Sequence, residues 1–208
     1  MAHALSTRPA HNVRNATIIA VLVAWFLLAL GGSLLGVFDS APRPPLLLGL
    51  AAVGPVALFV ACYLTSTPFR QLVSSLDLRT LTLAQTWRVG GIVFVILYLQ
   101  GALPGAFALP AGWGDFAIGV TAPVVAWYWR PPFPRRTFIV WNVLGCLDLV
   151  LAVTLGVLSS PSPLGVLAGD VTTRPMGQFP LSLIPTFFVP LLLIFHLICL
   201  IRVRERAA

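Results

Sequence analysis

The stretch "LAQTWRVGGIVFVILYLQ" (residues 83–100) decides the fold class, because it is apolar over a length that suits the hydrocarbon core of a membrane. A helix needs about 20 predominantly apolar residues to cross ~30 Å of hydrocarbon. The stretch nevertheless contains a permanent cation, Arg88, in its first half. A charge at this depth is costly unless it has a partner, so Arg88 is a candidate functional residue by its position alone.

The composition of the whole chain agrees with a membrane protein. Its 208 residues are 58% hydrophobic and 9% charged, whereas a soluble domain normally has about 25% charged residues. The lipid bilayer is therefore the first partner that the sequence predicts. The net charge of +7 does not indicate nucleic acid, because the arginines lie in short loops and tails and form no basic stripe with interleaved aromatic residues.

The residue types that the chain lacks exclude several chemistries. All thirteen basic residues are arginine, so neither a Schiff-base lysine nor a Walker A phosphate loop is present. The three cysteines lie in apolar segments and form no CxxC pair, and only one histidine, His196, lies in an apolar segment, which leaves no pair of axial haem ligands. The sequence predicts no cofactor and no metal site.

Six apolar segments predict an all-α polytopic membrane protein, a bundle of six transmembrane helices in one domain (16–201). A β-barrel would need alternating apolar and polar residues, and these segments are apolar on every face. A cytoplasmic N-terminal tail (1–15) and a basic cytoplasmic C-terminal tail (202–208) flank the domain. The expected spans are residues 16–38, 46–64, 81–103, 114–129, 137–158 and 181–201.

The distribution of arginine predicts the orientation of the chain in the cell inner membrane. Ten of the thirteen arginines lie in the two tails and in the second and fourth connections, and two lie in the other connections. The positive-inside rule then places both termini in the cytoplasm. The second connection, "TPFRQLVSSLDLRTLTL" (67–83), has apolar residues spaced as on one face of a helix, which predicts a short interfacial helix between the second and third spans.

Polar residues inside the spans are the candidate ligand-binding or proton-relay residues. Gln85, Arg88 and Gly91 recur at helical spacing on one face of the third span. At 1.5 Å per residue, Arg88 lies roughly 10 Å deep and Asp148 of the fifth span about 16 Å deep. An arginine side chain is long enough to bridge that difference, so we expect Asp148 to neutralise Arg88, and a purely structural ion pair is one interpretation of this contact.

Three further polar residues complete the set of candidates. Asn142 of the fifth span suits a hydrogen bond between helices, and His196 of the sixth span suits either packing or proton transfer. The segment "GALPGAFALPAGWGD" (101–115) is rich in glycine and proline, which predicts an irregular connection that dips into or re-enters the membrane. Asp115 then opens the fourth helix, as a simple cap or as a member of a site.

The sequence leaves three functions open. The first is a binder or transporter of a small molecule, anionic or proton-coupled, with a polar cavity between the third, fifth and sixth spans. The second is an accessory or scaffold subunit that docks onto a membrane-protein partner or a second copy through small-residue stripes such as Ala16, Ala20 and Ala24. The third is an enzyme that acts on a lipid-soluble substrate with His196 and an aspartate as acid and base.

Overall fold

The structure is a computed structural model that describes residues 8–128 and 135–205, with side chains described from residue 16 onward. Every regular element in these two ranges is helical, which confirms the all-α prediction. The elements are α1 (Arg8–Leu34), α2 (Leu46–Thr65), α3 (Thr67–Ser75), α4 (Leu78–Ala84), η1 (Gln85–Gly91), α5 (Ile92–Leu99), α6 (Gly105–Tyr128), α7 (Arg135–Leu158), η2 (Arg174–Gly177), η3 (Ile184–Phe188) and α8 (Val189–Glu205).

Five helical stretches in the described part of the chain are long and apolar enough to cross a membrane, which is consistent with a multi-pass membrane protein. Two of them are composite: α4, η1 and α5 form one stretch, and η3 and α8 form another. α6 has 24 residues, as many as α7, but is not among the five. The five stretches are Ala16–Leu34, Leu46–Thr65, Leu78–Leu99, Arg135–Leu158 and Ile184–Glu205.

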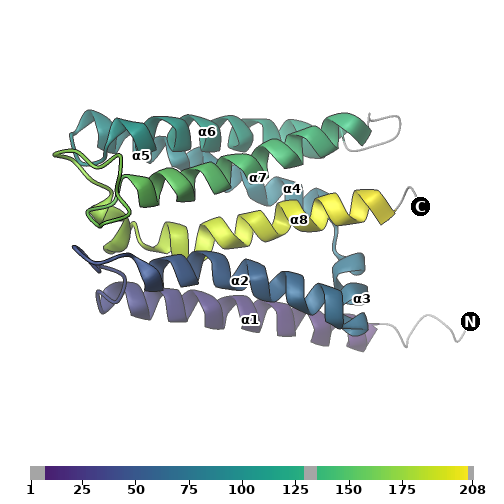
Figure 1. Cartoon of the computed structure of the whole chain (residues 1–208). Helices are drawn as coiled ribbons and strands as arrows, with labels where there is room; N and C mark the ends of the chain where they lie inside the picture. The colour runs from purple at the N-terminus through teal and green to yellow at the C-terminus, as the bar shows by residue number, and fades with distance from the viewer. Residues whose placement is uncertain (1–7, 129–134, 206–208) are drawn as a thin grey trace, which may run out of the picture.

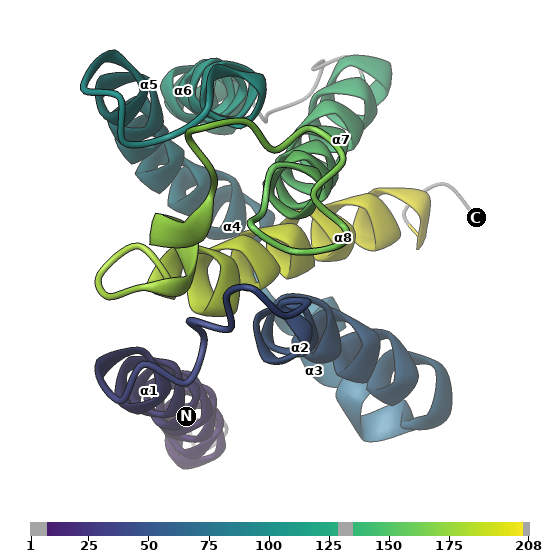
Figure 2. The ribbon, with the colours of Figure 1, turned by 60° about the vertical axis from the view of Figure 1, so that its left-hand side comes forward.

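The long helices run back and forth alongside one another, so that both described ends of the chain lie at the same end of the bundle (Figure 1). We call this end the termini end. α3 lies there, between α2 and α4. α8 runs between the pair α1 and α2 on one side and the group α4 to α7 on the other, as two views agree (Figure 2). α8 is therefore the central helix of the bundle.

Hydrogen bonds fix the connection between α2 and α4. The Ser66 hydroxyl accepts from the backbone of Phe69 at the start of α3, and the Asp77 carboxylate accepts from the backbone of Thr80 at the start of α4 (2.9 Å). These bonds satisfy backbone donors that a helix start leaves free, and hydrogen bonds from Thr80 hold the pKa of Asp77 below its usual value. Arg202 of α8 donates to the backbone carbonyl of Val73 (3.1 Å) and so fastens α3 to the bundle.

The expectation of an irregular connection over residues 101–115 is wrong from residue 105 onward, because α6 begins at Gly105. Tertiary packing accounts for the helix despite Pro110. Phe107 packs against Phe94 of α5 with ring centroids 5.3 Å apart, and a Cβ atom at Gly112 would lie 3.1 Å from the carbonyl oxygen of Gly91. Gly105, Gly112 and Gly114 are sites of close helix contact rather than helix breakers, whereas Gly101, with a φ of +71°, lies in the turn before α6. Asp115 consequently lies inside α6 and does not cap its start.

Two spans contain non-α segments. The 3₁₀ segment η1 interrupts the third span, and the π-helical segment η3 opens the last one. Such segments inside helices are often found at functional sites. Pro190, buried in α8, lacks the backbone N–H that would bond the carbonyl of Thr186, which accounts for the irregular turn before it. Gly119, Ala122 and Ala126, three small residues at helical spacing, form a buried face of α6.

Candidate functional site

The 3₁₀ segment η1 sets the position of Arg88. A 3₁₀ helix has three residues per turn, so side chains three residues apart lie directly above one another. Gln85, Arg88 and Gly91 are therefore aligned on one face, and all three are buried. Trp87, beside them in the sequence, is 76% exposed on the outside of the bundle. The local backbone thus turns Arg88, the one charged residue of η1, towards the protein interior.

Arg88 binds two carboxylates at once. Its Nε donates to Oδ1 of Asp115 (2.7 Å), and its Nη2 donates to Oδ2 of Asp148. Its Nη1 donates to the backbone carbonyl of Gly145 (3.2 Å) and contacts Nε2 of His196 (3.1 Å). Arg88 is only 2% exposed. Its three nitrogens therefore all have partners within the protein, drawn from α6, α7 and α8.

The contacts of His196 fix its protonation state. The Nη1 of Arg88 can only donate, so Nε2 of His196 accepts and carries no proton. The proton then sits on Nδ1, which lies 2.9 Å from Oδ1 of Asn142. The amide nitrogen of Asn142 donates in turn to the carbonyl of Phe138 (2.8 Å), which makes Oδ1 the acceptor. His196 is therefore a neutral histidine, held between Arg88 and Asn142, and both it and Asn142 are fully buried.

We call these five residues the Arg88 cluster: Arg88, Asp115, Asn142, Asp148 and His196. Its charges do not balance. Arg88 contributes one positive charge, His196 is neutral, and two ionised carboxylates contribute two negative charges. An excess charge in surroundings of low dielectric is costly, so the cluster favours the binding of one proton or one cation.

Glycines bring the helices close enough for the cluster to form. A Cβ atom at Gly114 would collide with the carboxylate of Asp148, and one at Gly145 would collide with the ring of His196. At Gly119 a Cβ atom would lie 2.9 Å from the backbone carbon of Arg88. From the sequence, Gly119 and Gly145 are expected at close helix contacts, whereas Gly114 was missed, and none of the three was assigned to the site. The signal that could have found them is their place one to four residues from a buried polar residue on the same helix.

Gln85 lies one 3₁₀ turn from Arg88 but outside its hydrogen-bond network. Its amide nitrogen donates to the carbonyl of Leu192 in α8 (3.0 Å). Within the described residues, its amide oxygen is a buried acceptor that no donor reaches. Gln85 therefore ties η1 to α8 and leaves one acceptor next to the cluster.

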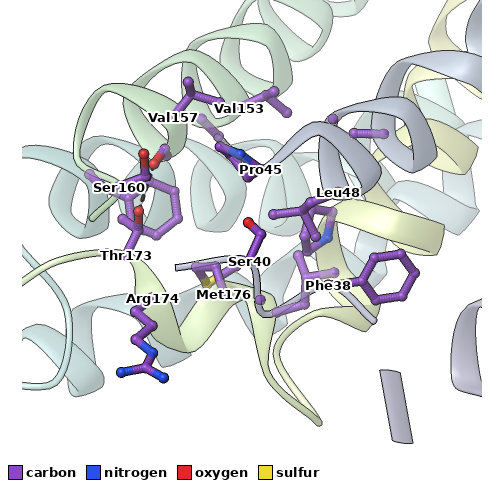
Figure 3. Close-up of a pocket in the computed structure, with 18 of the residues that line it drawn as sticks. Phe38, Ser40, Pro45, Leu48, Val153, Val157, Ser160, Thr173, Arg174 and Met176 are labelled. Carbon is purple, nitrogen blue, oxygen red and sulfur yellow. Dashed lines mark hydrogen bonds between the residues drawn. The ribbon is translucent and has the colours of Figure 1, made fainter. Parts of the chain in front are cut away.

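A cavity of about 90 Å³ begins at Asp115 and runs towards the end of the bundle opposite the termini. We call it the Asp115 cavity. Its wall is almost entirely apolar, and Figure 3 shows side chains from α7 (Val153, Val157), α2 (Leu48) and the connections (Phe38, Met176) gathered around it. Asp115 is 9% exposed. It is the member of the Arg88 cluster that lines the cavity.

Polar groups from two connections meet at the mouth of this cavity. Asp39 of the α1–α2 connection accepts from Nη2 of Arg174 (3.3 Å) and from the amide of Gln178 (2.8 Å), both of the α7–α8 connection. The hydrogen bond from Gln178, followed by that from Arg174, holds the pKa of Asp39 below its usual value. Asp39 and Arg174 both line the mouth. The two connections are thus latched together at the mouth of the cavity.

The structure brings most of the candidate residues from the sequence into one cluster. The structure brings Arg88, Asp148, His196 and Asn142 together, adds Asp115 as a second carboxylate on Arg88, and leaves Gln85 beside the cluster. Of the five cluster residues, only Asp115 lines the cavity. The cavity is therefore not enclosed by Arg88, Asn142, Asp148 and His196 as expected but lies on the far side of Asp115. In residues 8–128 and 135–205, no group of His, Cys, Asp and Glu side chains is arranged to hold a metal ion.

Residues 45–204 match the family model of DUF8737, a domain of unknown function. This chain belongs to that family. The matched segment contains every residue of the Arg88 cluster and excludes α1. No curated protein and no solved structure matches the chain.

Proposed function

We propose that this DUF8737 protein binds or transports a small molecule through the Asp115 cavity, with a proton bound at the Arg88 cluster. The observation that carries the proposal is the place of Asp115, which is both a carboxylate of a cluster with one excess negative charge and part of the cavity wall. To exchange a proton for a ligand, one residue must both bind the proton and be reached from the cavity. Buried ionisable residues that adjoin a cavity commonly mark proton and substrate pathways in membrane proteins.

The proposal includes six spans in the cell inner membrane, with α6 as the sixth spanning helix. α6 has 24 residues and lies alongside α5 and α7 in the bundle (Figure 1). An even number of spans agrees with both ends of the chain lying at the same end of the bundle. The elements that begin or end there contain six arginines with described side chains, Arg70, Arg79, Arg135, Arg136, Arg202 and Arg204. This supports a cytoplasmic location for the termini and an interfacial location for α3. The Asp115 cavity then opens to the outside.

A proton-coupled function is better supported than the binding of an anion. Arg88 is the only buried cation of the site, and each of its nitrogens already has a partner in the protein. An anion would have to displace Asp115 or Asp148 from Arg88 and leave a carboxylate unpaired. The excess of carboxylates over cations supports the uptake of positive charge instead.

The enzymatic alternative has less support from the geometry. An acid or base must come within hydrogen-bond reach of the proton that it transfers. Both ring nitrogens of His196 are engaged, by Arg88 and by Asn142, and its side chain is fully buried. A substrate would therefore find no ring nitrogen of His196 free to accept or donate a proton.

The scaffold alternative is favoured by one observation. Ala16, Ala20 and Ala24 of α1 are exposed on the surface of the bundle, and small residues at this spacing let a second helix approach closely. A partner protein or a second copy of the chain would dock there. This surface lies outside the family segment and away from the Arg88 cluster, so it does not compete with the cavity for the same residues.

Native mass spectrometry of the protein purified in mild detergent tests the proposed function. We expect a retained small molecule, whose mass adds to that of the chain. Ala152→Leu, which fills the cavity wall, should lose the adduct. Val150→Leu is the matched control, because Val150 is 52% exposed on the outer surface of the same helix. A co-purifying protein without any small molecule would favour the scaffold, and an adduct that Ala152→Leu retains would contradict the cavity as its site.

A further inference from the structure

We propose that the ligand of the Asp115 cavity is a small organic cation, an ammonium group that carries a short apolar chain. This inference rests on the proposed function, because it names the ligand class of the same cavity. It draws on three properties of the cavity: its charge, the chemistry of its wall and its size.

The charge comes from the Arg88 cluster at the inner end. Asp115 gives one oxygen to Arg88, and in the described residues no donor is placed on the other. The cluster has one more carboxylate than Arg88 can neutralise. A cation beside Asp115 would supply the missing charge, and it would do so in place of the proton. Cation and proton therefore compete for a single negative charge, so that binding one releases the other.

The wall has the chemistry that recognises an organic cation rather than a hydrated metal ion. Phe94 and Phe107 line the cavity wall and pack against each other with ring centroids 5.3 Å apart, and Phe38 lies towards the mouth. The faces of aromatic rings attract ammonium groups, and aromatic rings are the usual partners of methylated ammonium ligands. A metal ion would need several oxygen ligands, and Asp115 is the only carboxylate at the inner end of the cavity.

The size limits the ligand. The cavity measures about 90 Å³, which is less than the ~150 Å³ of an engineered apolar cavity that accepts benzene. A methylated ammonium head, which is smaller than benzene, matches this space, and the chain that it carries extends out through the mouth. The mouth carries polar groups such as Ser160, Thr173 and Arg174 (Figure 3), so a terminal polar group on the chain is accommodated.

Binding of choline, compared with its uncharged isostere 3,3-dimethylbutan-1-ol, tests the inference. The two molecules have the same shape and differ in one positive charge. We expect choline to bind in isothermal titration calorimetry and to raise the melting temperature of the full chain in detergent, and the isostere to do neither. In a weakly buffered solution, choline should release up to about one proton per chain. Equal binding of the two molecules, or binding of neither, would overturn the inference.

Two variants tie the binding to the cavity. Asp115→Asn should weaken choline binding at least about tenfold, whereas Asp170→Asn, the same change at an exposed residue of the α7–α8 connection, should leave it unchanged. If Asp115→Asn does not fold, Ala152→Leu decides, because it fills the cavity without touching a charge. Choline binding that survives Ala152→Leu would contradict the site. A neutral adduct in native mass spectra together with no choline binding would overturn the cation and leave the proposed function standing.

Discussion

The first and the last spanning helices have nearly the same mean hydropathy but pack very differently. Ala16–Leu34 of α1 has a mean hydropathy of 2.3 and Ile184–Glu205 of η3 and α8 has 2.5, yet 11% of the first and 39% of the second are buried inside the bundle. Hydropathy therefore indicates that a helix can cross a membrane, but it does not indicate what the helix packs against. The greater burial of α8 is due in part to its close contact with Gly145 of α7 and to the contacts of His196 with Arg88 and Asn142.

α1 is attached to the bundle mainly near the end opposite the termini. The hydroxyl of Ser33 lies 2.5 Å from that of Ser182, and Trp25 and Phe26 pack against Phe187 with ring centroids 5.0 and 5.1 Å away. Towards the termini end, an apolar groove of about 710 Å³ separates α1 from α2, α3 and α8. Figure 2 shows α1 set apart from its neighbours. The family segment begins at residue 45, so it excludes this peripheral helix.

The largest effect that this contrast implies is that of removing Arg88. Arg88→Met leaves two carboxylates buried without a cation, and breaking a buried ion pair typically costs about 3–5 kcal/mol. We expect a loss of folded protein, measured as the monodisperse fraction in gel filtration in mild detergent. The triple variant with Asp115→Asn and Asp148→Asn removes all three charges and should recover much of the loss. A triple variant that is no better than Arg88→Met would show that the cluster charges are not the cause.

A pair of glycine substitutions compares the two regions directly. Gly119→Ala places a Cβ atom against the backbone of η1, whereas Gly31→Ala in α1 meets no atom within 4 Å. Overpacking of this kind costs about 1–3 kcal/mol, while alanine in an open helical position is neutral or stabilises by up to about 1 kcal/mol. Thermal unfolding in detergent should show Gly119→Ala melting earlier than the wild type and Gly31→Ala not. The reverse order would contradict the close approach of η1 and α6.

A smaller effect is expected at the attachment of α1. Ser33→Ala removes the hydrogen bond to Ser182, and such bonds between membrane helices are worth about 0.6 kcal/mol on average. We expect a slight decrease in melting temperature and no change in choline binding, because neither residue lines the Asp115 cavity. A loss of stability as large as that of Gly119→Ala would show that α1 is an integral part of the bundle rather than a peripheral helix.

The smallest effect concerns the latch at the mouth of the cavity and depends on pH. The pKa of Asp39 is lowered in the folded protein, so its contribution to stability is fully present above its unfolded pKa of about 3.9. That contribution is lost as the pH falls through the lower folded value. The difference in melting temperature between wild type and Asp39→Asn should therefore be present at neutral pH, begin to shrink near about pH 4, and disappear once the pH is below the folded pKa. A difference that persists there would exclude the carboxylate as its source.

The sequence was sufficient for the helical class and for the pair of Arg88 and Asp148, because both follow from hydropathy and from depth along a helix. It was not sufficient for Asp115, whose role depends on where α6 begins. The glycines and prolines of residues 101–115 indicate a loop by local propensity, and the structure uses Gly112 and Gly114 as contacts with α5 and α7 instead. Tertiary packing overrides local propensity at this point.

The cavity was also beyond the sequence. Its inner end is a carboxylate that the sequence had assigned to a helix start, and its mouth is built by two connections that are far apart along the chain. Apolar residues such as Ala152 and Val157 line it, and nothing in their pattern distinguishes them from residues that face lipid. The position of a cavity is set by the tilt and spacing of helices, which hydropathy does not encode.

Infrared spectroscopy of the reconstituted protein tests whether the Arg88 cluster contains one carboxylate more than it has cations. At neutral pH and without ligand, we expect the carbonyl-stretch band of one protonated carboxylic acid. Asp115→Asn and Asp148→Asn should each abolish the band, because either leaves one carboxylate paired with Arg88. Asp170→Asn should retain it. A wild-type spectrum without a protonated carboxylic acid, or a band that survives in both single variants, would contradict the account.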